Sequence, residues 1–262
     1  MPFKKTYVEK YGYEKVVTER NSPLAYLELD FIKLKEQETI TIDEPNKEFA
    51  IIILYGLVSV KGATFEFSKC GKREDVFSGP AEVVYVGKDE PFIITSLKCD
   101  AKIAVCKAPA LKKFSARYIT TEEIVTKNLG RGSFARKAAF NLPSEVEANL
   151  LYIGEFWVED GNWASFPPHK HDIDYGGESQ LDEIYYFEFD KEVGFGFQGI
   201  YSKDGKIDEV YRVKTGDLVE IPKGYHPFTV APGYKCYCLW LMAGKKRGLF
   251  SSIDSDHFWQ VK

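Results

Sequence analysis

Residues 216–226 have the sequence Gly-Asp-Leu-Val-Glu-Ile-Pro-Lys-Gly-Tyr-His. Gly216 marks a turn, and the apolar residues that follow it are typical of a strand. Pro222 and Gly224 then mark a tight turn, and His226 stands at the start of the next strand. This stretch therefore predicts two consecutive short strands with a chemically active side chain at the turn between them.

The same alternation of short strands and turns extends along the whole chain. Runs rich in β-branched and aromatic residues are separated by Gly, Pro, Asp and Lys, and no segment has a sustained helical period. The one short helix that we expect covers residues 121–125, where Thr121 would cap the helix and acidic residues follow it. Runs of this length and spacing predict an all-β fold of the sandwich or barrel type.

Composition excludes several classes of protein. The chain has 262 residues, 44% of them apolar, and a formal net charge of −4, which argues against a basic nucleic-acid-binding surface and against disorder. No apolar run approaches the roughly 20 residues that cross a bilayer, and the first residues do not resemble a signal peptide. The five cysteines form no C-x2-C pair. We therefore expect a cytoplasmic protein with reduced thiols that binds neither nucleic acid nor membrane.

Two similar halves are expected. Both are rich in strands, and residues 78–94 and 214–230 share the order turn, apolar strand, turn, which suggests an internal duplication. The predicted boundaries are an N-terminal barrel over 1–110, a linker over 111–147 and a C-terminal barrel over 148–262.

All four histidines lie in the second half of the chain. Residues two apart on a strand point to the same face, so His169 and His171 aim at one place. Glu183 opens an apolar strand, where a carboxylate is costly to bury unless it is paired or bound to a metal. With His226 these residues suit a divalent transition metal with open positions, which could be zinc, manganese or iron. The last histidine, His257, is interpreted as a surface residue.

These residues resemble the two motifs of the cupin superfamily, His-x-His with a later Glu and G-x5-P-x-G-x-His. The gap from His171 to Glu183 is longer than in the common form, which points to a subfamily. Several segments resemble the 5-deoxyglucuronate isomerases of myo-inositol catabolism, and the 5-keto-4-deoxyuronate isomerases of pectin breakdown are relatives that share the metal set. The segments that carry this resemblance are 161–172, 182–186, 194–198, 222–227 and 254–259.

The resemblance implies a bicupin, an all-β protein of two jelly-roll-like β-barrels with the metal only in the C-terminal one. The absence of histidine from residues 1–150 agrees with a degenerate N-terminal barrel. The implied reaction is the metal-dependent aldose–ketose isomerisation of 5-deoxy-D-glucuronate to 2-deoxy-5-keto-D-gluconate. The ligands that the resemblance implies are His169, His171, Glu183 and His226.

Candidate catalytic and substrate residues follow from strand parity and charge. Glu183 and Tyr185 share a face and are the catalytic candidates, although Tyr185 could instead be a packed barrel aromatic. Gln198 is the candidate for a hydrogen bond to a substrate oxygen, or a glutamine that caps the core. Arg136, or its neighbour Lys137, could hold the carboxylate of a small deoxy sugar acid. Neither the general base nor the choice between proton transfer and hydride shift is decided by the sequence.

Other functions remain open from sequence alone. They are the pectin-pathway isomerase activity, a metal-dependent cupin dioxygenase and a non-catalytic sugar-acid-binding bicupin. Self-association into a homo-oligomer is also open, because barrels with broad apolar faces often pair.

Overall fold

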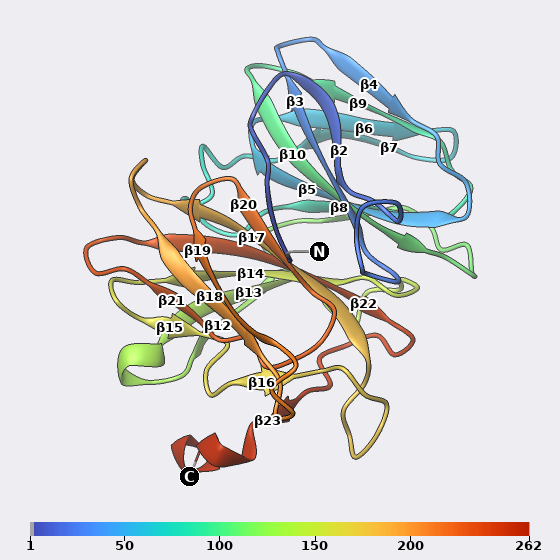
Figure 1. The fold of residues 1–262 in the computed structure, drawn as a ribbon. Helices are drawn as coiled ribbons and strands as arrows, with labels where there is room; N and C mark the ends of the chain where they lie inside the picture. The colour runs from blue at the N-terminus through green and yellow to red at the C-terminus, as the bar shows by residue number, and fades with distance from the viewer. Residues whose placement is uncertain (1–2, 262) are drawn as a thin grey trace.

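The computed structural model describes residues 3–261, and nearly all of its regular structure is antiparallel β-sheet (Figure 1). Two short 3-10 helices, η1 (Gly132–Phe134) and η2 (Ser255–Gln260), are the only helical segments in this part of the chain. The all-β prediction is therefore confirmed. No helix within residues 3–261 has the length and apolar character needed to cross a membrane.

The C-terminal half is a sandwich of a seven-stranded and a four-stranded sheet, which we call the C-terminal sandwich. The order in the large sheet is β1 (Lys4–Thr6), β20 (Asp217–Ile221), β17 (Leu181–Phe189), β22 (Cys236–Gly244), β14 (Tyr152–Val158), β13 (Arg136–Leu142) and β12 (Val125–Leu129). The order in the small sheet is β15 (Trp163–Ala164), β21 (Phe228–Val230), β18 (Gly196–Tyr201) and β19 (Asp208–Val213). A two-stranded ribbon of β16 (His169–Lys170) and β23 (Ser252–Ile253) lies beside them.

The N-terminal half forms a second sandwich, the N-terminal sandwich, from a six-stranded and a four-stranded sheet. The order in the large sheet is β11 (Arg117–Ile119), β8 (Val83–Val86), β5 (Lys47–Tyr55), β10 (Ala101–Pro109), β3 (Glu28–Leu34) and β2 (Gly12–Val17). The order in the small sheet is β4 (Thr39–Ile42), β9 (Phe92–Ser96), β6 (Val58–Gly62) and β7 (Glu66–Cys70).

The two sandwiches have the same topology. The order β8-β5-β10-β3-β2 corresponds to β20-β17-β22-β14-β13, and β4-β9-β6-β7 corresponds to β15-β21-β18-β19. The registers agree as well, because Phe49 pairs with the last residue of β8 and with Lys107, and Glu183 pairs with the last residue of β20 and with Met242. Phe49 and Glu183 are therefore equivalent positions, and the expected internal repeat is present in the structure.

The boundaries of the halves differ from those predicted, because each half gives a strand to the other. Strand β1 pairs with β20 in the C-terminal sandwich, whereas β11 pairs with β8 in the N-terminal one. The segment 111–147, expected to be a linker, contains β11, β12 and β13. These strands were missed because such short or exposed segments carry little hydrophobic pattern.

The expected helix over residues 121–125 is absent. The backbone there forms a tight turn in which Glu123 N–H donates to Thr120 O, and β12 begins at Val125. Glu123 also reaches Arg117, so the acidic residues serve the turn rather than a helix end.

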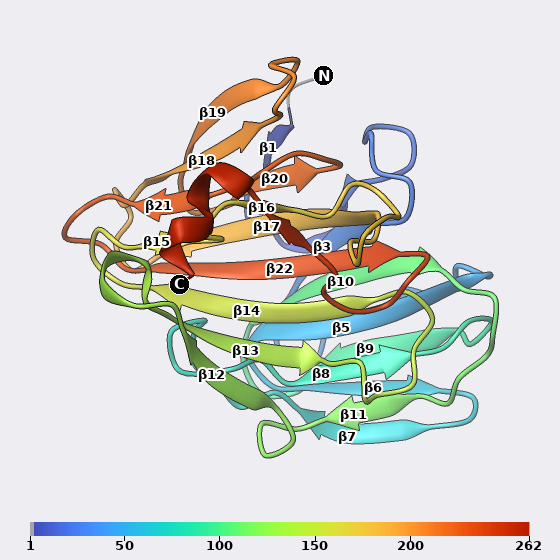
Figure 2. The same ribbon diagram turned by 90° about the horizontal axis from the view of Figure 1, so that it is seen from below.

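The large sheets of the two sandwiches pack against each other, so three apolar layers alternate with four sheets (Figure 2). On β17, Ile184 and Tyr186 face the layer between the two large sheets, whereas Tyr185 and Phe187 face the interior of the C-terminal sandwich. Burial on both faces explains why the central strands are continuously apolar instead of alternating with polar residues.

Candidate metal centre and substrate pocket

Three predicted ligands meet inside the C-terminal sandwich. The Nε2 atom of His171 lies 3.0 Å from Glu183 Oε2, and Nε2 of His226 lies 3.2 Å from the same oxygen. His171 follows β16, Glu183 lies on β17, and His226 is in the turn before β21. All three side chains are buried, and their donor atoms lie within 4.8 Å of one another. This geometry could hold one metal ion.

Backbone carbonyls orient both imidazoles. His171 Nδ1 lies 2.9 Å from Leu181 O, and His226 Nδ1 lies 2.9 Å from Gly224 O. Since a carbonyl can only accept, each ring carries its proton on Nδ1 and turns the Nε2 lone pair toward Glu183. This tautomer is the one that metal-binding imidazoles need.

The turn before His226 requires glycine. Gly224 has a φ of +93°, and a Cβ at this position would lie 2.9 Å from Tyr201 O. The N–H of Gly224 donates to Asp172 Oδ2. The turn is thus fixed by its conformation and by a carboxylate one residue beyond His171, which couples the two histidine segments.

The electrostatics of the three residues favour a cation. Burial alone would raise the pKa of Glu183, but the contacts with His171 and His226 outweigh it and hold the pKa at about 2. Burial would likewise lower the pKa of His171, and Glu183 outweighs it in the other direction. Nε2 of His226 is buried and has no hydrogen-bond partner within residues 3–261. A lone pair that faces a carboxylate oxygen is unfavourable unless a positive ion lies between them, so these residues fit a divalent transition metal.

His169 lies beside this group without belonging to it. Its ring centroid is 4.7 Å from that of His226 and 6.4 Å from that of His171. Burial, followed by the neighbouring histidines, lowers the pKa of His169 to about 3, so the imidazole is neutral and has a lone pair to give. Its role as the fourth ligand stays a prediction.

A pocket of about 80 Å3 opens beside Glu183 and His169. Its walls come mainly from the interior face of the large sheet, with aromatic side chains and one guanidinium among them. The other residues that line it are Leu129, Arg136, Ala138, Phe140, Phe156, Ser165, Tyr185, Trp240, Met242 and Leu249.

Arg136 brings a positive charge into this pocket. The guanidinium is half-buried, and its one hydrogen bond is a 3.3 Å contact from Nη1 to Phe134 O. No ion pair within residues 3–261 involves Arg136, and burial lowers its pKa. Lys137 points elsewhere, with Nζ over the ring of Trp157. Of the two cations that the sequence offered for a substrate carboxylate, the structure therefore brings only Arg136 to the pocket.

Tyr185 also lines the pocket, and its hydroxyl lies 2.6 Å from Ser165 Oγ. Burial, with the nearby Glu183 carboxylate, raises the pKa of Tyr185 well above its ordinary value, so the phenol stays protonated and can donate. Ser165 was not predicted. It has a φ of +52°, and a lone serine before two prolines gives no sequence signal for a site.

Gln198 is fully buried but does not line the pocket. Its Nε2 donates to the carbonyls of His226 and Pro227 at 2.7 and 3.1 Å. These partners match the alternative of a glutamine that caps the core, and here it supports the segment that carries His226. A contact with substrate stays an untested prediction.

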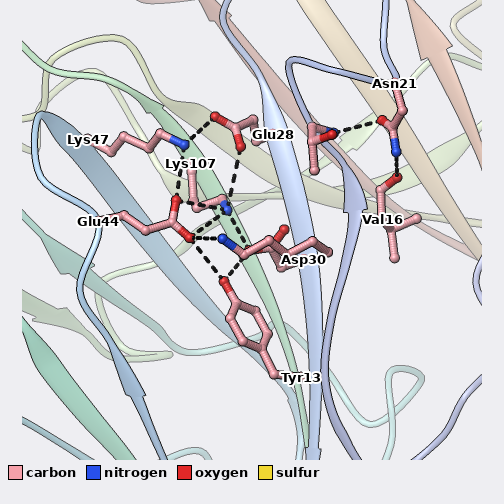
Figure 3. A network of polar contacts seen from close by, with 10 residues as sticks. Tyr13, Val16, Asn21, Glu28, Asp30, Glu44, Lys47 and Lys107 are labelled. Carbon is pink, nitrogen blue, oxygen red and sulfur yellow. Dashed lines mark hydrogen bonds and ion pairs between the residues drawn. The ribbon is translucent and has the colours of Figure 1, made fainter.

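The equivalent end of the N-terminal sandwich contains an ion cluster instead of histidines (Figure 3). Lys107, which is equivalent to Met242, is fully buried, and its Nζ lies 2.6 Å from Asp30 and 3.3 Å from Glu44. Tyr13 donates to Asp30, and Lys47 contacts Glu44. An ammonium group thus neutralises the carboxylates inside this sandwich.

Comparisons with known proteins agree with this site. The model of the KduI/IolB family matches residues 4–260. The 5-deoxy-glucuronate isomerase of Bacillus licheniformis is 37% identical over 246 residues, which cover 93% of this chain and 90% of the relative. The protein of the same name from Bacillus subtilis strain 168 is also 37% identical, with the same coverage.

Solved structures extend the likeness to three dimensions. An IolB-like protein from Salmonella typhimurium LT2 superposes with a TM-score of 0.95 and 31% identity, covering 100% of both chains. Oxalate decarboxylase from Bacillus subtilis has a TM-score of 0.66 at 13% identity, covering 96% of this chain and 78% of that one, and shows a shared fold alone. The two-barrel fold class is thereby confirmed, and the chain belongs to the KduI/IolB family.

Proposed function

We propose that this protein is an aldose–ketose isomerase that converts 5-deoxy-D-glucuronate to 2-deoxy-5-keto-D-gluconate in the cytoplasmic catabolism of inositol. The names of the relatives at 37% identity support this substrate. A divalent transition metal, which could be zinc, manganese or iron, would be held by His171, Glu183 and His226, with His169 as the fourth ligand.

The observation that carries the proposal is a pocket lined by both Glu183 and an arginine without an ion-pair partner. A substrate that fits such a pocket has a carboxylate at one end and a reactive carbonyl with a neighbouring hydroxyl at the other. A deoxyuronate in its open-chain form has both groups. Arg136 would hold the carboxylate, and the histidine cluster would receive the carbonyl end.

The reaction moves one hydrogen between neighbouring carbons. The C–H beside the aldehyde loses a proton, the aldehyde carbon gains one, and the hydroxyl proton passes to the former aldehyde oxygen, so atoms balance without a co-reactant. A bound divalent metal supplies stabilisation of the negative charge that develops on the two oxygens.

The chain's own residues supply the proton chemistry. Both imidazoles contact Oε2 of Glu183, which leaves Oε1 to accept and return the carbon-bound proton. The protonated phenol of Tyr185, supported by Ser165 Oγ at 2.6 Å, donates a hydrogen bond to the substrate oxygen that becomes negative. The aromatic wall keeps bulk water away from the intermediate.

The test is an assay of the purified, metal-loaded protein with two substrates. Conversion of 5-deoxy-D-glucuronate to the ketose acid, with much slower turnover of the 4-deoxy-5-ketouronate of pectin breakdown, is expected. Preference for the pectin uronate would transfer the protein to the neighbouring activity. Oxygen uptake with bound iron would indicate a dioxygenase, and metal binding without turnover of either uronate would indicate a binding protein.

A further inference from the structure

Asp182 is a buried carboxylate next to Glu183 that faces away from the pocket. It lies on β17, and its Oδ2 accepts a hydrogen bond of 2.6 Å from the backbone N–H of Tyr26, in the N-terminal half of the chain. The N–H groups of Ala25 and Leu27 also stabilise this carboxylate. The start of the strand that carries Glu183 is therefore attached to a loop some 156 residues away in sequence.

The other half of the molecule contains the same attachment in reverse. Glu48, at the equivalent position of β5, accepts from the backbone N–H groups of Asn149, Leu150 and Leu151 at 2.7, 2.6 and 2.9 Å. Asp182 pairs with Ala243 of β22 as Glu48 pairs with Ala108 of β10, which establishes the equivalence. Each half thus uses one carboxylate to bind the three residues before the equivalent strand, β3 or β14, of the other half.

Only one of the two attachments adjoins the metal centre. Leu181 O, directly before Asp182, accepts from His171 Nδ1, and Glu183, directly after it, is the predicted ligand. At the equivalent place beside Glu48 the strand carries Phe49, which has no ligand atom. Moving Asp182 would thus displace both the carbonyl that orients His171 and the carboxylate that faces the metal.

We propose that Asp182 is a positioning residue through which the N-terminal half holds His171 and Glu183 in the geometry that binds the metal. This inference rests on the metal centre of the proposed function and gives the histidine-free half a role in it. A carboxylate that accepts from successive backbone N–H groups fixes the backbone on both sides of the contact. Residues that orient metal ligands in this way contribute roughly 10- to 100-fold to metal affinity.

The experiment compares Asp182→Asn with its matched control, Glu48→Gln. Each amide keeps the size of its carboxylate, but its NH2 group faces backbone donors and its charge is lost. Both variants are expected to unfold at a lower temperature than the wild type. Zn2+ and Mn2+ affinity is measured on the metal-free full chain by competition with a chelator, without any substrate.

We expect Asp182→Asn to bind both metals at least about tenfold more weakly, and Glu48→Gln to remain within about twofold of the wild type. Asp182→Glu should restore affinity, because Glu48 shows that the longer carboxylate can meet the same donors. Wild-type affinity in Asp182→Asn, or an equal loss in Glu48→Gln, would overturn the proposal. If Asp182→Asn does not fold, Asp182→Ser undergoes the same titration with the same two outcomes.

The result is independent of the substrate assignment. A wild-type protein that binds metal but does not isomerise 5-deoxy-D-glucuronate would refute the proposed function and leave the positioning role standing. A wild-type protein that binds neither metal would refute the positioning role as well.

Discussion

Arg73 Nη1 lies 2.8 Å from Glu155 Oε1, and this ion pair joins the two sandwiches where water has little access. Glu155 also accepts from Tyr237 Oη at 2.6 Å and from Asn141 Nδ2 at 2.8 Å, so both of its oxygens are satisfied. Together with the shared apolar layer, this network makes the halves one folding unit.

Replacing Arg73 with methionine is expected to lower the free energy of unfolding by about 3–5 kcal/mol, because it leaves the buried Glu155 carboxylate without its cation. Urea denaturation measures the change. Lys72→Met is the control, since this neighbouring lysine forms only exposed contacts with Glu122 and should change the midpoint little. Equal losses in the two variants would contradict a special role for the buried pair.

Replacing His226 with alanine should abolish metal binding and reduce isomerisation to the level of chelated wild-type protein. The physical reason is the loss of the buried Nε2 that has no other partner. Elemental analysis and product assays measure both effects. His257→Ala, whose ring packs 6.1 Å from Phe166, should retain metal and activity. Chelated wild-type protein should recover on addition of the metal, whereas His226→Ala should not.

Replacing Arg136 with methionine should lower kcat/KM for a deoxyuronate by roughly 10- to 100-fold, the value of losing charge-assisted hydrogen bonds to a carboxylate. Metal content should stay unchanged. Steady-state kinetics provide the measurement, and Lys137→Met is the matched control because its ammonium lies over Trp157. Unaltered kinetics in Arg136→Met would remove this residue from substrate binding.

The N-terminal ion cluster predicts a specific loss of stability in acid. Burial alone would raise the pKa of Glu44, but Lys15 and Lys47 outweigh it and bring the pKa to about 2 from an ordinary 4.5. Below about pH 4.5 the unfolded chain takes up the proton while the native state keeps Glu44 ionised until about pH 2, so this contribution is present above the window and disappears through it.

The measurement for this cluster is the stability difference between wild type and Glu44→Gln. Thermal unfolding midpoints at pH 7 and pH 2 should show a clear difference at the higher pH that shrinks at the lower one. Glu66→Gln, which removes an exposed carboxylate of the same half, is the control. A difference that stays constant with pH would contradict the assignment to Glu44.

Local patterns predicted part of this molecule well. Strands such as β5, β17 and β22 are long and apolar, so their existence was clear from sequence. The histidine set was visible because His169, His171 and His226 stand in a chain with few histidines and beside turn-forming residues. Short strands such as β1 and β11 could not be predicted, since only pairing with the other half defines them.

The amino-acid sequence by itself determined the strand-rich class, the repeat and the residue types that could bind a metal, because these depend on periodicity and on turns between near neighbours. The tertiary structure alone decided that Glu183 meets His226, that Arg136 rather than Lys137 reaches the pocket, and that Asp182 is held by Tyr26. Such contacts join residues far apart in the chain, where no local pattern records which backbone donor a buried carboxylate will find.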